Sequence, residues 1–260
     1  MRILILTQEE NLYLPTTFAT VCREFPDEVV CIVSAPAMST HGGALRGLLR
    51  HVRLFGPVGT AVFGSRVIGA KIRDRTGQPD RNGPFHSIRA VAGAFDIPHH
   101  HVAKIKSDEF GSLLDKYEPE LLISVSCPQI IGKKIRDRFP KGCINVHGAP
   151  LPRYRGLMPA FWALRFDEKK TATTVHVLAD KLDNGEILKQ REVDITPEDT
   201  WDSLVRKTKQ AGAAALVETI HDIKRGTTRP LPNRDEEATY YSFPTARDRR
   251  AFLAAGRRFA

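Results

Sequence analysis

Short apolar segments alternate with helix-like segments along the first 150 residues of the chain. The apolar segments are predicted strands at Arg2–Leu6, Val29–Ser34, Leu121–Ser126 and Cys143–Val146. Apolar and charged residues recur at helical spacing around Thr17–Arg23 and in the Ile130–Asp137 region, between successive predicted strands. Strands that alternate with helices indicate parallel pairing. The pattern therefore predicts an α/β domain with a largely parallel sheet flanked by helices.

The second half of the chain carries a different pattern. Thr173–Val177 and Glu186–Ile195 alternate apolar and polar residues strictly, which predicts a hairpin or edge strands. A long helix is predicted to begin at Thr196, where a hydroxyl cap is followed by Pro197 and by an acid three residues on. A cationic last turn and Gly226 end this helix.

These elements divide the chain into a main domain and two additions. We expect one domain over residues 1–226, a basic insertion within it at 36–86, and a tail at 227–260 that packs across the domain. Ala44–Phe55 in the insertion has the pattern of an amphipathic helix. The insertion suits an acceptor-binding flap, a subunit interface or a phosphate clamp, with a solvated segment as the alternative. Its basic residues are Arg46, Arg50, Arg53, Arg66, Lys71, Arg73, Arg75 and Arg81.

Composition narrows the class of partner and compartment. The formal net charge of +9 favours anionic partners such as phosphates, nucleotides or nucleic acid. Four widely spaced cysteines form no CxxC pair, so we expect reduced thiols. The consecutive histidines at 99–101 would point to alternate faces of an extended segment, so we expect no metal. The N-terminal apolar run lacks a signal-peptide cleavage site and is too short to span a bilayer. We therefore expect a cytoplasmic protein with no membrane partner.

Chemistry-bearing residues concentrate between residues 144 and 185. Asn145 and His147 stand two residues apart at the end of a predicted strand, and Asp183 lies in a Leu-Asp-Asn-Gly turn. An amide donor, an imidazole and a carboxylate can together stabilise an oxyanion and move a proton, as acyl transfer requires. Each residue alone would be an ordinary turn residue or a satisfied histidine. Their combination predicts an acyl-transfer site.

Two longer motifs extend this site. The run NVHGAPLPRYRGLMPAFWAL begins at Asn145, and TTVHVLADKLDNGEIL begins at Thr173. Their Asn-x-His pair, Leu-Pro-x-Tyr-Arg-Gly loop and Leu-Asp-x-Gly turn resemble the core of the folate-dependent formyltransferases. That family includes glycinamide ribonucleotide, methionyl-tRNA and sugar N-formyltransferases. The resemblance implies a Rossmann-like formyltransferase fold with a short C-terminal extension, and N10-formyltetrahydrofolate as the formyl donor without a metal.

By this resemblance, a primary amine attacks the formyl carbon, and three catalytic residues follow. Asn145 would donate to the developing oxyanion, an interaction typically worth about 3–4 kcal/mol of the barrier. His147 would add a second donor and carry protons between the amine and the leaving nitrogen. Asp183 would hold His147 charged and oriented, or take the amine proton through a water. No nucleophilic serine or cysteine is needed, because the amine itself attacks.

Family precedent also implies binding residues. The pterin is expected against two main-chain segments at the carboxyl edge of the sheet. These segments are Cys127, Pro128, Gln129 and Ile130, and Val177, Leu178, Ala179 and Asp180. The acceptor is expected at the loop and helix start formed by Arg153, Tyr154, Arg155, Gly156 and Pro159.

Two departures from the family bear on the acceptor. The run from Thr7 to Glu10 stands where glycinamide ribonucleotide enzymes carry a Gly/Ser-rich phosphate loop. The chain also stops before the C-terminal barrel domain that methionyl-tRNA formyltransferase carries. We therefore expect a small, phosphorylated amine acceptor, first a nucleotide-linked amino sugar and second an amino-acid-derived amine. Glycinamide ribonucleotide and methionyl-tRNA stay open as alternatives.

Two other functions stay open. A formyltetrahydrofolate hydrolase would use the same polar residues with water as the nucleophile. A non-catalytic nucleotide- or nucleic-acid-binding protein would follow from the charge alone. The basic residues are not interleaved with stacking aromatics in a recognisable RNA-binding pattern, so nucleic acid is not the expected partner. A homodimer is compatible with all of these hypotheses.

Overall fold

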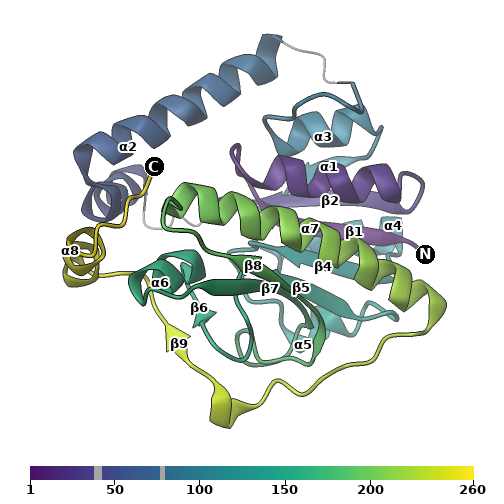
Figure 1. The fold of residues 1–260 in the computed structure, drawn as a ribbon. Coiled ribbons are helices and arrows are strands. Elements are labelled where there is room, and N and C mark those ends of the chain that lie inside the picture. The colour runs from purple at the N-terminus through teal and green to yellow at the C-terminus, as the bar shows by residue number, and fades with distance from the viewer. Residues whose placement is uncertain (38–42, 77–79) are drawn as a thin grey trace.

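A seven-stranded sheet lies at the centre of the computed structural model, which describes residues 1–37, 43–76 and 80–260 (Figure 1). Its strand order is β3-β2-β1-β4-β5-β7-β8. The bounds are β1 Ile3–Gln8, β2 Val29–Ala35, β3 His99–His101, β4 Leu121–Val125, β5 Cys143–His147, β7 Lys170–Val177 and β8 Ile187–Asp194. β1 to β5 pair in parallel, and β7 runs antiparallel to β5 and β8. The predicted α/β class with a largely parallel sheet is confirmed.

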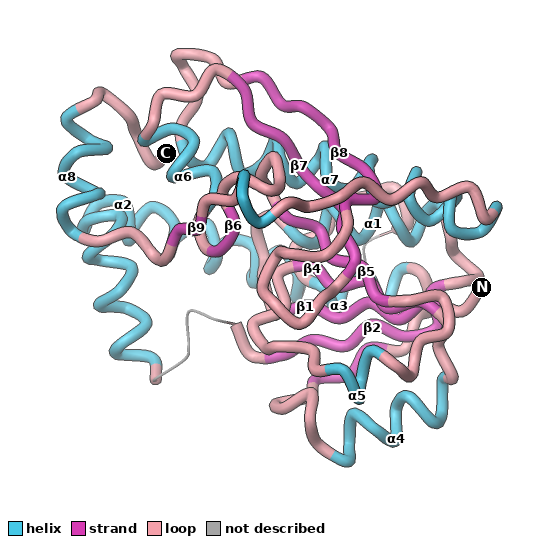
Figure 2. Tube along the Cα trace, turned by 90° about the horizontal axis from the view of Figure 1, so that it is seen from below, coloured by secondary structure: helices cyan, strands magenta, loops and turns pink. Residues whose placement is uncertain are grey.

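Helices cover both faces of this sheet (Figure 2). α1 (Leu14–Glu24), α3 (Ile88–Ala94) and α7 (Trp201–Arg225) supply buried apolar side chains to one core cluster with β1, β4 and β5. α4 (Asp108–Tyr117) and the short α5 (Lys133–Arg136) pack in a second cluster with the opposite face. Covering both faces explains why β1 and β4 read as continuous apolar runs.

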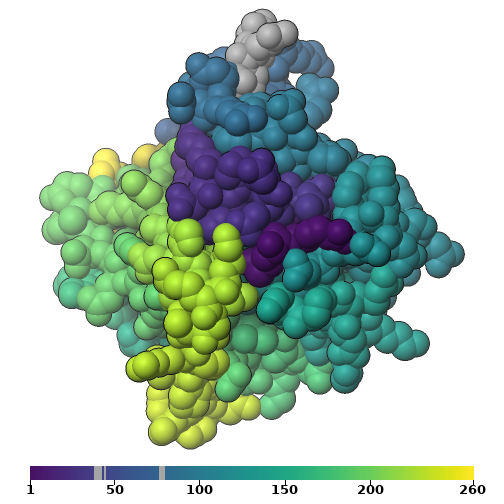
Figure 3. All heavy atoms as spheres, turned by 90° about the vertical axis from the view of Figure 1, so that its right-hand side faces the viewer, coloured from purple at the N-terminus to yellow at the C-terminus, as the bar shows by residue number. Residues whose placement is uncertain are grey.

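The N-terminal strand and helix are built deeply into one side of the molecule. Figure 3 shows β1 and α1, in purple, between the yellow-green end of α7 and the teal segments that follow α3. The N-terminal ammonium lies 3.4 Å from a carboxylate oxygen of Glu28. α1 packs against α7 on this side of the molecule, in the core cluster that both helices share.

The long helix α7 starts later than the sequence predicts. The Thr200 hydroxyl accepts from the Ser203 amide at 3.1 Å, and the Ser203 hydroxyl accepts from the Thr200 amide at 3.0 Å. Thr196 forms its own turn instead, in which its amide donates to the Asp199 carboxylate at 2.9 Å. The predicted start at Thr196 is therefore wrong, because a second hydroxyl pair four residues on makes a complete capping box. The predicted end at Gly226 is correct.

Helix α2 (Ala44–Thr76) contains the predicted 44–55 helix and continues beyond it. Gly56 interrupts it with φ 74° and ψ 172°, and Pro57 follows. A Cβ at Gly56 would lie 2.7 Å from a guanidinium nitrogen of Arg249, whose Nε donates to the Leu54 carbonyl. The kink is therefore packed against the C-terminal segment. Residues 38–42 and 77–79 of the predicted 36–86 insertion lie outside the described residues.

A third core cluster joins α2 to the C-terminal segment. It includes α6 (Pro159–Arg165) and α8 (Ala246–Ala254), and its centre is aromatic. The Phe252 ring stacks on Phe161 and Phe259 with centroid separations of 4.8 Å and 4.7 Å. Within the described ranges, no helix is long and apolar enough to cross a membrane.

Residues 227–260 run back across the main domain. Leu231 bridges to Ile187 at the start of β8. Further on, β9 (Tyr240–Tyr241) pairs in parallel with β6 (Arg155–Gly156) as a small second sheet. The segment thus contacts the loop that carries the predicted acceptor residues.

Candidate active site

The strand pair β5–β7 places the polar residues of the site on one corner of the sheet. Asn145 lies directly opposite His176 in the antiparallel register, and His147 lies opposite Thr174. Asn145 and His147 are two residues apart on β5, so their side chains share one face. His147 is the last residue of β5, which puts this corner at the carboxyl edge where open α/β sheets bind ligands.

Asn145 is oriented by a histidine that it faces across the strands. The Asn145 amide nitrogen lies 3.1 Å from Nε2 of His176, and Nδ1 of His176 lies 2.9 Å from the Val177 carbonyl oxygen. A carbonyl only accepts, so Nδ1 carries the hydrogen and Nε2 accepts from the amide. Burial lowers the pKa of His176 to about 4, against the opposing effect of Asp183. His176 is therefore neutral near pH 7, and by accepting one hydrogen of the Asn145 side-chain amide it fixes the orientation of that amide.

His147 is held between a carbonyl and a carboxylate. Its Nε2 donates to the Tyr154 carbonyl at 2.8 Å, and its Nδ1 lies 3.6 Å from Oδ2 of Asp183. The same carboxylate oxygen accepts from the Gly156 amide at 2.9 Å, and Oδ1 lies 3.7 Å from Nε2 of His176. His147 and Asp183 are each only 7% exposed. The structure thus brings the predicted Asn145, His147 and Asp183 together and places one carboxylate between two imidazoles.

The turn that carries Asp183 is packed tightly against β7. Asp183 has a φ of 51°, in the left-handed region, and a Cβ at Gly185 would lie 1.8 Å from the Val177 carbonyl oxygen. Glycine is therefore required at 185. The Asn233 side-chain amide donates to the carbonyls of both Asp183 and Gly185 at 2.9 Å. The tail beyond residue 227 consequently helps to fix the turn that carries Asp183.

The first predicted pterin segment follows β4. Cys127 and Gln129 are half-buried, and the Gln129 side chain bridges the Ala103 carbonyl and the Ile105 amide at 2.9 Å and 3.0 Å. Ile130 is 75% exposed, and Pro128 lies between these residues in the same loop. Burial raises the pKa of Cys127 to about 11, so this thiol stays protonated near pH 7. Pterin contact by these residues stays a prediction.

The second predicted pterin segment follows β7. The Leu178 amide donates to the Cys143 carbonyl at 2.8 Å, and Val177 ends the strand. Arg136 binds this segment from α5, by a hydrogen bond to the Ala179 carbonyl and an ion pair with Asp180. The segment is therefore anchored beside the Asp183 turn, and its contact with the pterin is likewise a prediction.

The predicted acceptor residues are largely engaged within the chain. The buried Arg155 guanidinium donates to Asp235 at 2.6 Å and to the Asn233 side-chain oxygen at 2.7 Å. Tyr154 donates its hydroxyl to Glu168 at 2.6 Å, and burial together with this bond raises its pKa. The structure thus gives both side chains an internal role, which the sequence prediction lacked: they fasten the tail and the loop. Their contact with substrate remains an untested prediction.

The other three members of that group sit around the loop. Arg153 is exposed and pairs with Glu168 at 3.3 Å. Gly156 offers its amide to Asp183, and a Cβ there would lie 2.2 Å from the Tyr241 carbonyl oxygen. Pro159 begins α6. Gly156 therefore positions the Asp183 carboxylate through its main chain.

Two residues of the site were missed by sequence reasoning. His176 is one of them, because it reads as an ordinary residue of an alternating strand. Lys209 on α7 is the other: its ammonium donates to the Ser126 hydroxyl at 3.0 Å, just beyond the carboxyl end of β4. Burial lowers the pKa of Lys209 to about 8. Lys209 lies seven residues before the buried Leu216, so helical spacing places its charge within the apolar stripe of α7. A charge at such a position could have been noticed in the sequence.

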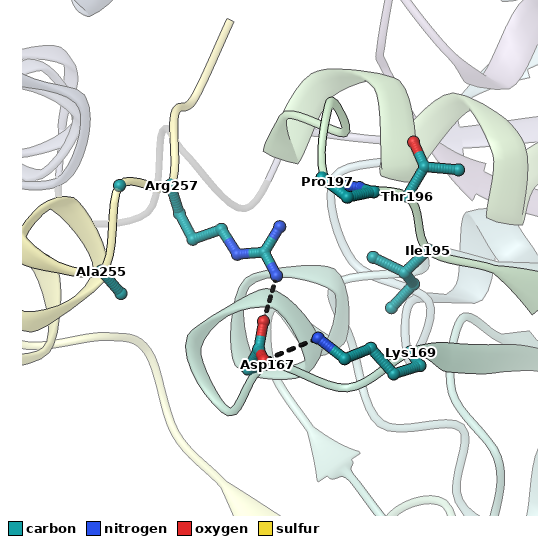
Figure 4. A pocket seen from close by; sticks show the side chains of 8 residues that line it. Asp167, Lys169, Ile195, Thr196, Pro197, Ala255 and Arg257 are labelled. Carbon is teal, nitrogen blue, oxygen red and sulfur yellow. Dashed lines mark hydrogen bonds and ion pairs between the residues drawn. The ribbon is translucent and has the colours of Figure 1, made fainter.

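A separate pocket of about 260 Å³ lies away from this corner (Figure 4). It opens beside Asp167, Lys169, Ile195, Thr196, Pro197, Ala255, Gly256 and Arg257. Asp167 pairs with both Lys169 and Arg257 inside it. Lys169 immediately precedes β7, whose opposite end carries His176, so this pocket is distinct from the candidate active site. In the described part of the chain, no three His, Cys, Asp or Glu side chains cluster as a metal site would require.

Comparison with known proteins gives consistent matches. Residues 69–220 match the formyl transferase family. A methionyl-tRNA formyltransferase from Thermodesulfovibrio yellowstonii is 36% identical over 174 residues, which are 65% of this chain and 56% of that protein. The chain spans about half the length of the curated relatives it matches.

Two solved structures extend the comparison. Glycinamide ribonucleotide transformylase 1 from Symbiobacterium toebii has a TM-score of 0.61 at 18% identity, and the match covers 89% of this chain and 94% of that chain. The formyltransferase PseJ from Anoxybacillus kamchatkensis was solved in complex with UDP-4,6-dideoxy-4-formamido-L-AltNAc and tetrahydrofolate. It has a TM-score of 0.50 at 26% identity, over 62% of this chain and 81% of that chain.

The fold and the corner at its carboxyl edge define an α/β protein in which a half-buried asparagine lies near a buried His–Asp pair. The family match spans more than half of the residues. The chain belongs to the formyl transferase family, and the resemblance seen in its motifs is confirmed.

Proposed function

We propose that this protein transfers a formyl group from N10-formyltetrahydrofolate to a primary amine. The observation that carries the proposal is the buried corner in which Asp183 lies between His147 and His176 while Asn145 is aimed by His176. Formyl transfer forms a bond from the amine nitrogen to the formyl carbon, breaks the bond from that carbon to N10, and moves one proton from the amine to N10. An oxyanion develops on the way.

Each corner residue supplies one part of that step. Among the described residues, the Asn145 amide donates only to His176, so its second hydrogen is available to the oxyanion. His147 keeps its Nε2 hydrogen on the Tyr154 carbonyl, so Nδ1 is the nitrogen that gains and loses a proton beside Asp183. Asp183 stabilises the imidazolium that forms. Burial of the corner strengthens these interactions, because little water competes for them.

The residues present fit a folate donor. The half-buried loop after β4 and the anchored segment after β7 begin at neighbouring strand ends, which supports placing the pterin against their main chains. When bound there, the donor supplies an activated formyl group. The chain's own contribution is to hold that group between Asn145 and His147.

For the acceptor, we infer an amine on a phosphorylated metabolite, first a nucleotide-linked amino sugar. Lys209 supports this choice, because it offers a half-buried ammonium at the same edge of the sheet. The relative crystallised with a UDP-linked formamido sugar and tetrahydrofolate also supports it. Methionyl-tRNA is the second candidate, favoured by the identity of 36% to a methionyl-tRNA formyltransferase.

Release of tetrahydrofolate from N10-formyltetrahydrofolate tests the proposal. The assay uses separate incubations with nucleotide-linked amino sugars, amino acids, glycinamide ribonucleotide and methionyl-tRNA. We expect turnover with one acceptor class, lost in His147→Ala and kept in His221→Ala, whose imidazole pairs with Glu24 on the surface. Equal release without any amine would identify a hydrolase instead. Tight, salt-sensitive binding of generic RNA or DNA without folate turnover would identify a nucleic-acid-binding protein.

A further inference from the structure

The outward face of α2 collects exposed apolar side chains. Seven of the thirteen large hydrophobic side chains that are exposed in the described part of the chain belong to this one helix. They are Leu45, Leu48, Leu49, Val52, Val58, Ile68 and Ile72. Leu45, Val58 and Ile68 are 70%, 76% and 61% exposed. Exposed apolar groups gathered in this way mark an interaction surface, whereas scattered ones do not.

The exposed residues form stripes along the helix. Leu45, Leu48, Leu49 and Val52 follow the i, i+3, i+4, i+7 spacing of one helical face before the kink at Gly56. After the kink, Ile68 and Ile72 are four residues apart, and Val58 lies close to the face of Ile72 on a helix of 3.6 residues per turn. Each half of α2 therefore has an apolar stripe of its own.

A different face of α2 already packs against the protein. Leu54 and Phe63 are buried in the aromatic core cluster with Phe252 and Phe259. Figure 1 shows α2 along the outer edge of the molecule, running from α8 toward α3. Each half of α2 thus carries an exposed apolar stripe in addition to its packed face, as far as the described residues show.

Most of the net charge of the protein lies on the same helix. α2 carries seven basic residues and one acid, a net charge of +6, against +9 for the whole chain. The basic residues are Arg46, Arg50, Arg53, Arg66, Lys71, Arg73 and Arg75. The acid, Asp74, is half-buried and faces Arg89 of α3 at 3.6 Å. Arg66 pairs with Asp202, and Arg50 lies over the Phe243 ring, so these two point toward the protein.

Four of the five other cations flank the apolar stripes. By helical spacing, Arg46 and Arg53 lie beside the Leu45–Val52 stripe, and Lys71 and Arg75 lie beside Ile68 and Ile72. All four are exposed. Long cationic side chains beside an apolar stripe can hold anionic groups while their stems extend the apolar surface.

We propose that α2 docks the protein on an anionic lipid membrane, with the aliphatic stripe in the headgroup boundary and the flanking cations on lipid phosphates. Charge complementarity selects this partner, because a helix of net charge +6 requires an anionic one. A nucleic acid would leave the aliphatic stripe in water, since such surfaces use cations with stacking aromatics. A second copy of the chain would bring two strongly basic helices together. Docking of this kind lies in the interface and needs no spanning helix, and it revises the sequence-based expectation of no membrane partner.

Co-sedimentation of the full chain with vesicles tests the proposal. We expect binding to phosphatidylcholine vesicles that contain about one-third phosphatidylglycerol, at least about tenfold weaker binding to pure phosphatidylcholine, and loss of binding at high salt. Leu48→Gln with Leu49→Gln should weaken binding about tenfold. The matched control is Leu253→Gln, an exposed leucine of α8, which should keep wild-type binding.

A second pair of variants separates the location of the charge from its amount. Arg46→Gln with Arg53→Gln removes two exposed cations from α2, and Arg247→Gln with Arg250→Gln removes two from α8. We expect only the α2 pair to weaken binding to anionic vesicles, by about tenfold. Unchanged melting temperatures would show that the variants fold.

Four results would overturn the proposal. One is the absence of vesicle binding by the wild-type chain, and another is equal loss of binding in the α2 and α8 variants. A third is binding of generic double-stranded RNA that the leucine variants leave intact while vesicles fail to bind. The last is a dimer in sedimentation equilibrium that the leucine variants dissociate, because the stripe would then cover a second copy.

Discussion

The corner at the end of β5 and the outward face of α2 arrange their side chains in opposite ways. In the corner, buried polar groups face one another at fixed distances: the Asp183 carboxylate lies 3.6 Å from His147 and 3.7 Å from His176. Along α2, apolar groups such as Val58 stand in solvent beside exposed cations. A buried polar group is stable only when it is bonded inside the fold, whereas an exposed apolar group is stabilised only when a partner covers it. The polar groups of the corner therefore find their partners within the chain. The apolar groups of α2 need a second surface to remove them from water.

The sharpest test of this contrast replaces Asp183. Asp183→Asn keeps the shape of the side chain but removes the charge that lies between His147 and His176. We expect turnover to fall about 10³-fold, the range of general acid–base catalysis, because the imidazolium of His147 loses its counter-charge. The measurement is tetrahydrofolate release with a soluble acceptor. The double variant Leu48→Gln and Leu49→Gln should keep turnover under the same conditions. An equal loss of turnover in this variant and in Asp183→Asn would show that the two regions do not have separate roles.

Asn145→Ala should have the next largest effect. It removes the amide that His176 aims at the oxyanion, and loss of one such donor lowers turnover about 10²- to 10³-fold. The Michaelis constant for the folate should change little, because the interaction forms mainly in the transition state. The amide control is Asn82→Ala, in the exposed loop before α3. A rise in the Michaelis constant without a fall in turnover would make Asn145 a binding residue.

Acid titration addresses the buried imidazole of the corner. The pKa of His176 is lowered from 6.5 to about 4, so the unfolded state binds this proton first as the pH falls. The stability that follows is fully present above about pH 6.5 and is lost as the pH falls to about 4, by roughly 3 kcal/mol in total. Urea unfolding at several pH values measures it. His176→Asn should remove this part of the pH dependence, and His221→Asn, a variant of a surface histidine, should keep it.

The smallest effect that we predict is on acceptor binding, when Lys209 loses its charge. Its pKa of about 8 means that its charge is lost as the pH rises through that value. We expect the Michaelis constant for a phosphorylated acceptor to rise about tenfold between about pH 7 and pH 9, because one ion-paired hydrogen bond is lost. Lys209→Met should have the high value at all pH values, with turnover less affected. Lys133→Met, which removes a surface pair with Asp137, serves as the control.

The central sheet could be predicted from the sequence because its strands are buried on both faces. Such strands read as apolar runs, and β1, β2, β4 and β5 were found within two residues of their predicted bounds. Motif spacing marked Asn145, His147 and Asp183 as candidates; β5 carries the first two, and the turn after β7 brings Asp183 to within 3.6 Å of His147. Local pattern was thus sufficient where each residue's role depends on its own strand or turn.

Other features depend on contacts between distant segments. The pairing of His176 with Asn145 follows from strand register, which an alternating sequence leaves undetermined. The engagement of Arg155 depends on Asn233 and Asp235, about eighty residues further along the chain. The start of α7 was misplaced because Thr196 and Thr200 both precede suitable partners, and tertiary packing decides between them.

The pairing of β6 with β9 has a consequence for synthesis on the ribosome. Gly156 holds Asp183 through its amide, and the loop that contains Gly156 is fastened by residues 233–241. A nascent chain that has released β5 and the Asp183 turn therefore still lacks the segment that locks them together. Since synthesis proceeds from the N-terminus, the sheet can form first and the site is completed only when those late residues emerge. A stalled or prematurely terminated chain would then carry a folded sheet without an ordered corner at the end of β5.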